Sequence, residues 1–148
     1  MATSGKPPNK VTVSWAGEQR FDAGRPGGPR LRLDGRAESG PSPVDALLGA
    51  LAACTSIDIV DILRKRRTPV DSLEIDVTGE RADAVPARVV RIELLFRMRG
   101  EGIERVHAER AAELAVTKYC SVRDTLDPAM PVEWAVVLDG ERGETRKG

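Results

Sequence analysis

The segment from Pro43 to Arg67 constrains the fold of this chain more than any other. Its first half, around the run LLGALAAC, is apolar on nearly all sides, whereas its second half carries Asp58, Asp61 and Lys65 on one helical face. Ser42 is a good N-cap, and Pro43 suits the first position of a helix. The pattern predicts one long helix that is buried on several sides and around which the remaining elements pack.

The two ends of this predicted helix are marked by charged residues. Asp45 follows Ser42 at the spacing of a capping box, so we interpret it as a helix-start residue rather than a catalytic one. The basic run Arg64–Arg67 lies where it stabilises the C-terminal dipole, and Thr68-Pro69 ends the helix. An anion or nucleic-acid patch is the alternative interpretation of that run.

Charge and hydropathy exclude several classes of protein. Lys plus Arg and Asp plus Glu are both 23, so the net charge is zero, which argues against a dedicated nucleic-acid binder. No uninterrupted apolar run approaches the roughly 20 residues that span a bilayer, and the polar N-terminus has no signal-peptide core. We therefore expect a cytoplasmic protein that binds neither nucleic acid nor membrane.

Alternating apolar and polar residues predict the strands of the domain. The second helix is expected from Ile103 to about Tyr119, with Cys120 at or just past its end. The order βββ-α-ββ-α-β indicates an α+β fold. The predicted strands are around Val11–Trp15, Gln19–Ala23, Arg30–Asp34, Leu73–Thr78, Val90–Met98 and Val132–Leu138.

One domain is expected from Val11 to Leu138, between a flexible tail at Met1–Lys10 and a polar, frayed tail at Asp139–Gly148. Aromatic residues make up only 3% of the chain, so its core has to be built from aliphatic side chains. Such a core is thin for this length, which hints at additional burial between subunits.

Two cysteines, Cys54 and Cys120, are the residues best suited to chemistry. In a reducing compartment a structural disulfide is disfavoured, which leaves buried small hydrophobes, metal ligands or redox-active thiols. A metal site is weakly supported, because the chain has no CxxC motif and a single histidine, His107. No GxGxxG, Walker A or HExxH motif is present, so we expect neither a metal nor a cofactor.

Two motifs together resemble the OsmC/Ohr family, the osmotically induced and organic-hydroperoxide-resistance proteins. They are the helix SPVDALLGALAAC that ends at Cys54 and the segment KYCSV that contains Cys120. The resemblance extends over Val11–Leu138 and includes the order of elements. It implies an OsmC-like fold with a long central helix and an intertwined homodimer with two active sites at the subunit interface.

The resemblance also implies a peroxidase mechanism. Cys54 would be the peroxidatic thiol that attacks the O–O bond, and Cys120 the resolving thiol that traps the sulfenic acid as a disulfide. An external dithiol, lipoyl-type in characterised members, would then reduce the disulfide. The substrate would be a small-molecule organic hydroperoxide, because Leu47, Leu48, Leu51 and Ile57 give the predicted helix apolar walls near Cys54.

Activation of Cys54 has to come from elsewhere in space, since a residue three turns inside a helix gains little from the helix N-terminus. The resemblance implies an arginine from the N-terminal region as thiolate partner. Arg36 is our catalytic candidate, although the aligned position is Asp34, with Arg32 on its other side. Peroxidase members carry a glutamate directly after the helix-start proline, where this chain has Val44.

Val44 keeps two further hypotheses open. One is an OsmC-like dimer that binds a small apolar or thiol-containing ligand, or is a stress-related protein, without efficient peroxidase turnover. The other is a structural or interaction protein in which both cysteines only pack.

Overall fold

The computed structural model describes residues 5–148, so the first four residues of the expected N-terminal tail lie outside the described part. The chain divides into two compact units, Met1–Leu47 and Leu48–Gly148.

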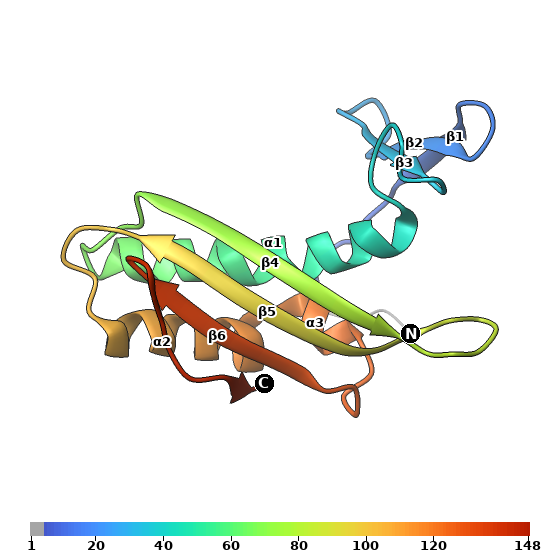
Figure 1. Cartoon of the computed structure of the whole chain (residues 1–148). Coiled ribbons are helices and arrows are strands. Elements are labelled where there is room, and N and C mark those ends of the chain that lie inside the picture. Colours follow the sequence, from blue (N-terminus) through green and yellow to red (C-terminus); the bar gives the residue numbers. More distant parts are fainter. Residues whose placement is uncertain (1–4) are drawn as a thin grey trace. The chain divides into compact units, whose positions relative to one another are not determined.

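The first unit contains a three-stranded antiparallel meander. Its strands are β1 (Thr12–Trp15), β2 (Arg20–Gly24) and β3 (Leu31–Asp34), in the order β1-β2-β3 (Figure 1). All three strands were expected from the alternation of apolar and polar residues, and this prediction is confirmed. Their ends differ from the expected ones by about one residue. Trp15 lies opposite Phe21, and Phe21 lies opposite Leu33.

This register gathers apolar side chains on one face of the meander, because paired residues and every second residue along a strand share a face. Much of that face is exposed: Trp15 is 69% and Val13 is 57% accessible. The opposite face is polar and carries the Arg32–Asp22 ion pair at 2.6 Å. The apolar face is formed by Val13, Trp15, Phe21, Ala23, Leu31 and Leu33.

Asp34 organises the loop that follows β3. Its buried carboxylate accepts hydrogen bonds from the backbone N–H groups of Arg36 (2.9 Å) and Ser39 (3.0 Å) and from the Ser39 hydroxyl (2.8 Å). These bonds, led by that of the Ser39 amide, lower the pKa of Asp34 from 3.8 to about 2.

Helix α1 (Pro43–Lys65) begins in the first unit and continues into the second. Its start is a reciprocal capping box: the Asp45 amide donates to Ser42 Oγ (3.1 Å), and the Ser42 amide donates to the Asp45 carboxylate (3.0 Å). The predicted N-terminus is confirmed, and Asp45 has the helix-start role expected of it.

The second unit is built on a sheet in which β5 is central. Strands β4 (Ser72–Arg81) and β5 (Val89–Arg99) form the expected antiparallel hairpin. Strand β6 (Val132–Leu138) pairs with β5 in parallel, so the chain needs a crossover, which α2 (Arg105–Leu114) provides (Figure 1).

The core lies between one face of this sheet and the two helices. Alternate β5 residues from Ile92 to Met98 are buried, together with alternate β6 residues, of which Trp134 is the largest. Helix α1 adds a stripe at four-residue spacing, and α2 adds alanines. Gly79 of β4 allows close contact, since a Cβ there would collide with the Leu48 side chain. The α1 stripe is Leu51, Thr55, Ile59 and Leu63.

Helix α1 is long and apolar enough to cross a membrane by length and composition alone. Its buried stripe nevertheless packs into the core described above, as in the central helix of a globular domain. Only 28% of its most apolar window is buried, so most of that surface is uncovered in the single chain. The sequence predicted that this helix is buried on several sides. Within the single chain, only one side of α1 is buried.

The second helical segment covers Arg105–Tyr119, close to the expected range, and Cys120 follows it as expected. It is not one regular α-helix: α2 ends at Leu114, a π-helical turn covers Ala115–Tyr119, and α3 (Ser121–Thr125) follows. One expectation about the C-terminal end is wrong. The tail after Leu138 is not frayed. It folds back as β7 (Glu141–Arg142) and β8 (Arg146–Lys147), which both pair with β6 because its outer edge offers free backbone groups.

We predict that the Asp34 loop loosens in acid. A carboxylate with a lowered pKa stabilises the folded form above its unfolded value of 3.8, and this contribution is lost as the pH falls through about 2. The protection factors of the Arg36 and Ser39 amides, which correct for the intrinsic exchange rate at each pH, should therefore fall from pH 4 to pH 2. In Asp34→Asn both amides should exchange fast already at pH 6, and equal protection in the two proteins at pH 6 would contradict this role.

Candidate functional site

Cys54 lies at the border of the buried stripe of α1. It is half-buried and packs against the core, between the fully buried Leu51 and Thr55. The Thr55 hydroxyl is satisfied within the helix, since it donates to the carbonyl of Ala52 at 2.9 Å. The thiol of Cys54 is therefore the reactive group that this part of α1 presents at the core boundary.

Cys120 is placed by the wide turn that ends the second helical segment. Its amide donates to the carbonyl of Ala115 at 3.1 Å, five residues earlier, and the Thr117 hydroxyl donates to the carbonyl of Glu113 at 2.6 Å. Such a turn inserts one extra residue and rotates the residues after it about the helix axis. Cys120 then leaves the helical conformation and becomes the N-cap of α3.

The two predicted thiols come together in the second unit. Cys120 is buried, with 4% exposure, and the Cys54 thiol is close enough to it to raise its pKa. Both are free cysteines. The structure thus brings together the two residues that sequence reasoning paired, while their peroxidatic and resolving roles stay predictions.

Burial dominates the acidity of Cys120. Desolvation in the first place, with a smaller contribution from Cys54, raises the pKa of the Cys120 thiol from 9.0 to about 11. The Arg123 amide, which donates to Cys120 Sγ at 3.3 Å, acts in the opposite direction but is outweighed. Cys120 is therefore a protonated thiol at neutral pH, able to donate a hydrogen bond.

A cavity of about 280 Å³ adjoins Cys120. Lys118 and Arg123 give its wall two positive charges, and Asp124 gives it one negative charge. The Arg123 guanidinium is fixed by two backbone carbonyls, of Asp127 and Met130, both at 3.1 Å. The complete lining is Val116, Thr117, Lys118, Cys120, Arg123, Asp124, Leu126, Pro128 and Gly148.

Sequence reasoning missed the cations of this cavity. Lys118 is part of the KYCSV motif, but nothing in that motif says which side chains share a wall with Cys120. The position of Arg123 could have been predicted from the sequence. It follows Cys120 by three residues, which is the spacing at which a backbone amide of a helix donates to the side chain of the N-cap residue.

Arg36, the predicted thiolate partner, belongs to the first unit. There its guanidinium pairs with Glu18 at 3.4 Å, and both side chains are exposed. Its amide is one of the donors that hold Asp34. Its catalytic role toward Cys54 stays a prediction, as does the consequence of Val44.

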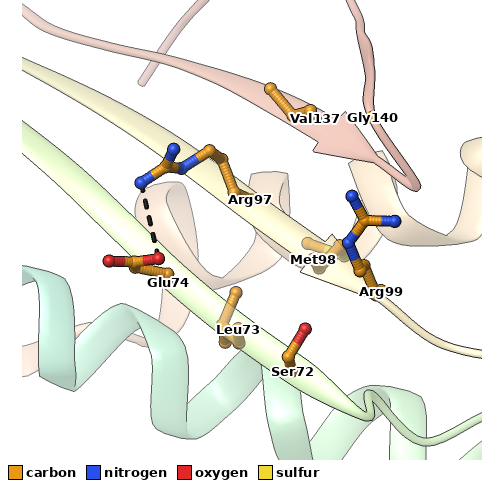
Figure 2. A pocket seen from close by; sticks show the side chains of 8 residues that line it. All are labelled: Ser72, Leu73, Glu74, Arg97, Met98, Arg99, Val137 and Gly140. Carbon is orange, nitrogen blue, oxygen red and sulfur yellow. Dashed lines mark ion pairs between the residues drawn. The ribbon is translucent and has the colours of Figure 1, made fainter.

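A second and larger cavity, of about 570 Å³, contains no thiol. It lies against the polar face of the sheet. Residues of β4, β5 and β6 line it, together with Gly140 in the turn after β6 (Figure 2). Arg97 reaches Glu74 across it at 3.5 Å. It shares no lining residue with the cavity at Cys120, so the thiol chemistry belongs to the smaller one.

Within residues 5–148, no group of three or more His, Cys, Asp or Glu side chains is arranged to hold a metal ion. The described part of the chain thus offers the thiol pair, with its charged cavity, as the group of residues best suited to chemistry.

Comparison with known proteins identifies the family. The model of the OsmC-like protein family matches residues 35–135. Protein YhfA of Escherichia coli K12 is 32% identical over 124 residues, which cover 83% of this chain and 92% of YhfA. A hypothetical protein from Aquifex aeolicus has a crystal structure with a TM-score of 0.78, at 26% identity, covering 90% of this chain and 99% of that one.

A solved organic hydroperoxide resistance protein is also similar in fold. OhrB of Bacillus subtilis gives a TM-score of 0.57 at 15% identity, covering 89% of this chain and 98% of that chain. At this identity the likeness concerns the fold alone. With the match to the family model and to YhfA, it follows that this chain belongs to the OsmC-like protein family.

Proposed function

We propose that this protein is a thiol peroxidase that reduces organic hydroperoxides in the cytoplasm, with Cys54 as the peroxidatic and Cys120 as the resolving cysteine. One observation carries the proposal: the two thiols, distant in sequence, lie close enough for Cys54 to raise the pKa of Cys120. A sulfenic acid formed on Cys54 would therefore meet a thiol at once and condense with it to a disulfide. OhrB, which shares the fold, is by its name an organic hydroperoxide resistance protein.

The proposed cycle conserves atoms and electrons. The Cys54 thiolate attacks one oxygen of the O–O bond, the alcohol leaves, and Cys54 becomes a sulfenic acid. The Cys120 sulfur then attacks the Cys54 sulfur, and water leaves as the disulfide forms. A dithiol supplies the two electrons and two protons that restore both thiols. Arg36 is proposed as the cation that favours the Cys54 thiolate.

The preference for organic substrates rests on the surface around Cys54. On α1 the neighbouring Ala50, Ala53 and Ile57 are exposed, and Ile57 is 63% accessible. Leu51, by contrast, is fully buried and serves the core. An alkyl or aryl group on the peroxide would bury part of this apolar surface, which hydrogen peroxide cannot do.

We also propose a homodimer, because the single chain leaves two apolar surfaces uncovered. One is the face of the meander that carries Val13 and Trp15, and the other is the outer side of α1 around Ile57. Contiguous exposed apolar surface of this kind marks an interaction site in a soluble protein. A second copy of this chain is the occupant that we propose for both surfaces.

A second candidate function is the binding of a small apolar or thiol-containing ligand without efficient turnover. The raised pKa of Cys120 favours it, because a thiol that stays protonated resolves a sulfenic acid slowly. Native mass spectrometry that finds an intact ligand copurified, with thiols that survive hydroperoxide for minutes, would favour this function over peroxidase activity.

We predict that brief exposure of the reduced protein to equimolar cumene hydroperoxide removes about two mass units, through a Cys54–Cys120 disulfide. Intact mass and non-reducing peptide mapping measure it. Cys120→Ser should instead gain one oxygen on Cys54, trapped by dimedone, and Cys54→Ser should lose turnover. If Cys54→Ser reduced hydroperoxide with a dithiol at the wild-type rate, Cys54 would not be the peroxidatic cysteine.

The acidity of Cys120 gives a second prediction. In Cys54→Ser, alkylation of Cys120 by iodoacetamide should stay slow through pH 9 and rise only toward pH 11, because burial keeps the thiol protonated. The same variant unfolded in urea is the control and should titrate near 9.0. A folded protein that titrates at or below the unfolded control contradicts the burial argument.

The dimer gives a third prediction. Sedimentation equilibrium should find twice the chain mass of 16.0 kDa, and Ile57→Glu should shift the protein toward 16.0 kDa because a charge enters the proposed interface. The matched control is Val85→Glu, at a fully exposed valine in the loop between β4 and β5, which should leave the mass unchanged. A wild-type protein that sediments at 16.0 kDa would refute the homodimer.

A further inference from the structure

We propose that Arg123 is a positioning residue of the thiol pair. It ties the turn that carries Cys120 to the segment leading into β6, and so holds the Cys120 sulfur in place for disulfide formation. The inference rests on the proposed function, because it names the residue that prepares Cys120 for the resolving step of that reaction.

Cys120 begins a segment that has little helical stability of its own. Helix α3 contains only the five residues Ser121–Thr125, and none of them is buried. A single helical turn is unstable in water, because nucleation fixes several residues for one hydrogen bond. Val122 and Leu126 pack against the core from this segment, but both are only partly buried. The turn therefore depends on further contacts with the rest of the fold.

Arg123 supplies such contacts in two directions. Its backbone amide donates to Cys120 Sγ at 3.3 Å, which holds the sulfur at the start of the turn. Its guanidinium donates through two different nitrogens to the carbonyls of Asp127 and Met130, both at 3.1 Å. A planar guanidinium with two acceptors has little conformational freedom. One residue thus connects the sulfur with a second turn further along the chain.

This second turn is anchored to the sheet. The Met130 amide donates to the Asp127 carbonyl at 3.0 Å, and the Met130 side chain is buried. The next residue, Pro131, accepts a hydrogen bond from the amide of Ile92 on β5 at 3.0 Å. Arg123 therefore links the proposed resolving sulfur, through this turn, to the paired strands β5 and β6.

A sulfur that is held in place favours the closed disulfide. A disulfide tolerates only a narrow range of distances and dihedral angles. A cysteine on a fixed turn loses less conformational entropy on closing than a cysteine on a frayed turn. Arg123 should therefore increase both the rate at which the disulfide closes and its equilibrium constant. Because the guanidinium binds neutral carbonyls, this effect depends on hydrogen bonds rather than on an ion pair.

The first test measures the equilibrium of the Cys54–Cys120 disulfide with dithiothreitol, which makes the result independent of hydroperoxide. Free thiols are trapped with N-ethylmaleimide, and intact mass gives the ratio of oxidised to reduced protein. Arg123→Met keeps the length of the side chain but removes its donors. It should lower the equilibrium constant about ten-fold, which corresponds to about 30 mV for this two-electron couple.

The second test separates positioning from a general loss of structure. With excess cumene hydroperoxide, Arg123→Met should form the Cys54 sulfenic acid at the wild-type rate, measured by dimedone trapping. Its disulfide should close more slowly, so that more Cys54 is oxidised further to the sulfinic acid. Arg110→Met is the matched control, because it removes an exposed guanidinium that pairs with Glu113 on α2, and it should change neither measurement.

A wild-type equilibrium constant in Arg123→Met would overturn the inference. An equal loss in Arg110→Met, or a sulfenic acid step that slows as much as disulfide closure, would overturn it as well. If Arg123→Met does not fold, Arg123→Lys replaces it: one ammonium matches two carbonyls less well, so the constant should fall about three-fold, and no fall contradicts the inference. The proposed function fails separately, if hydroperoxide forms no disulfide in the wild type.

Discussion

The packing of one stripe of α1 against the sheet is the constraint on which the second unit depends. Leu51, Thr55, Ile59 and Leu63 recur every fourth residue and fix the rotation of the helix about its axis. That rotation places Cys54 at the border of the core, in contact with Cys120. A hydrophobic interaction therefore sets the distance between two thiols, which leaves the chemistry of the pair to their surroundings.

Those surroundings treat the two thiols differently. Cys54 lies on a regular helix and is half-buried, whereas Cys120 ends a wide helical turn and is almost completely enclosed. The enclosure keeps the Cys120 proton at neutral pH. A protonated Cys120 can donate a hydrogen bond to a neighbouring acceptor.

Local signals in the sequence predicted most of the elements. The capping box at Ser42 and Asp45, the hairpin of β4 and β5 and the strand β6 depend on side chains close in sequence, so periodicity and spacing were enough. The π-helical turn before Cys120 depends on how α2 packs, and β8 depends on the free edge of β6. Such tertiary causes leave no periodic pattern. For the same reason the thiol pair came from family resemblance, and the cations beside it were missed.

The return of the chain along β6 has a consequence for how the sheet of the second unit can grow. Strands β7 and β8 and the Gly143 amide occupy the outer edge of β6. On the opposite side of the sheet, β4 pairs with β5 alone within the part of the chain that the structure describes. Free backbone groups on a strand edge recruit further strands. Extension of this sheet by another strand is therefore directional: it is blocked at β6 and open at β4.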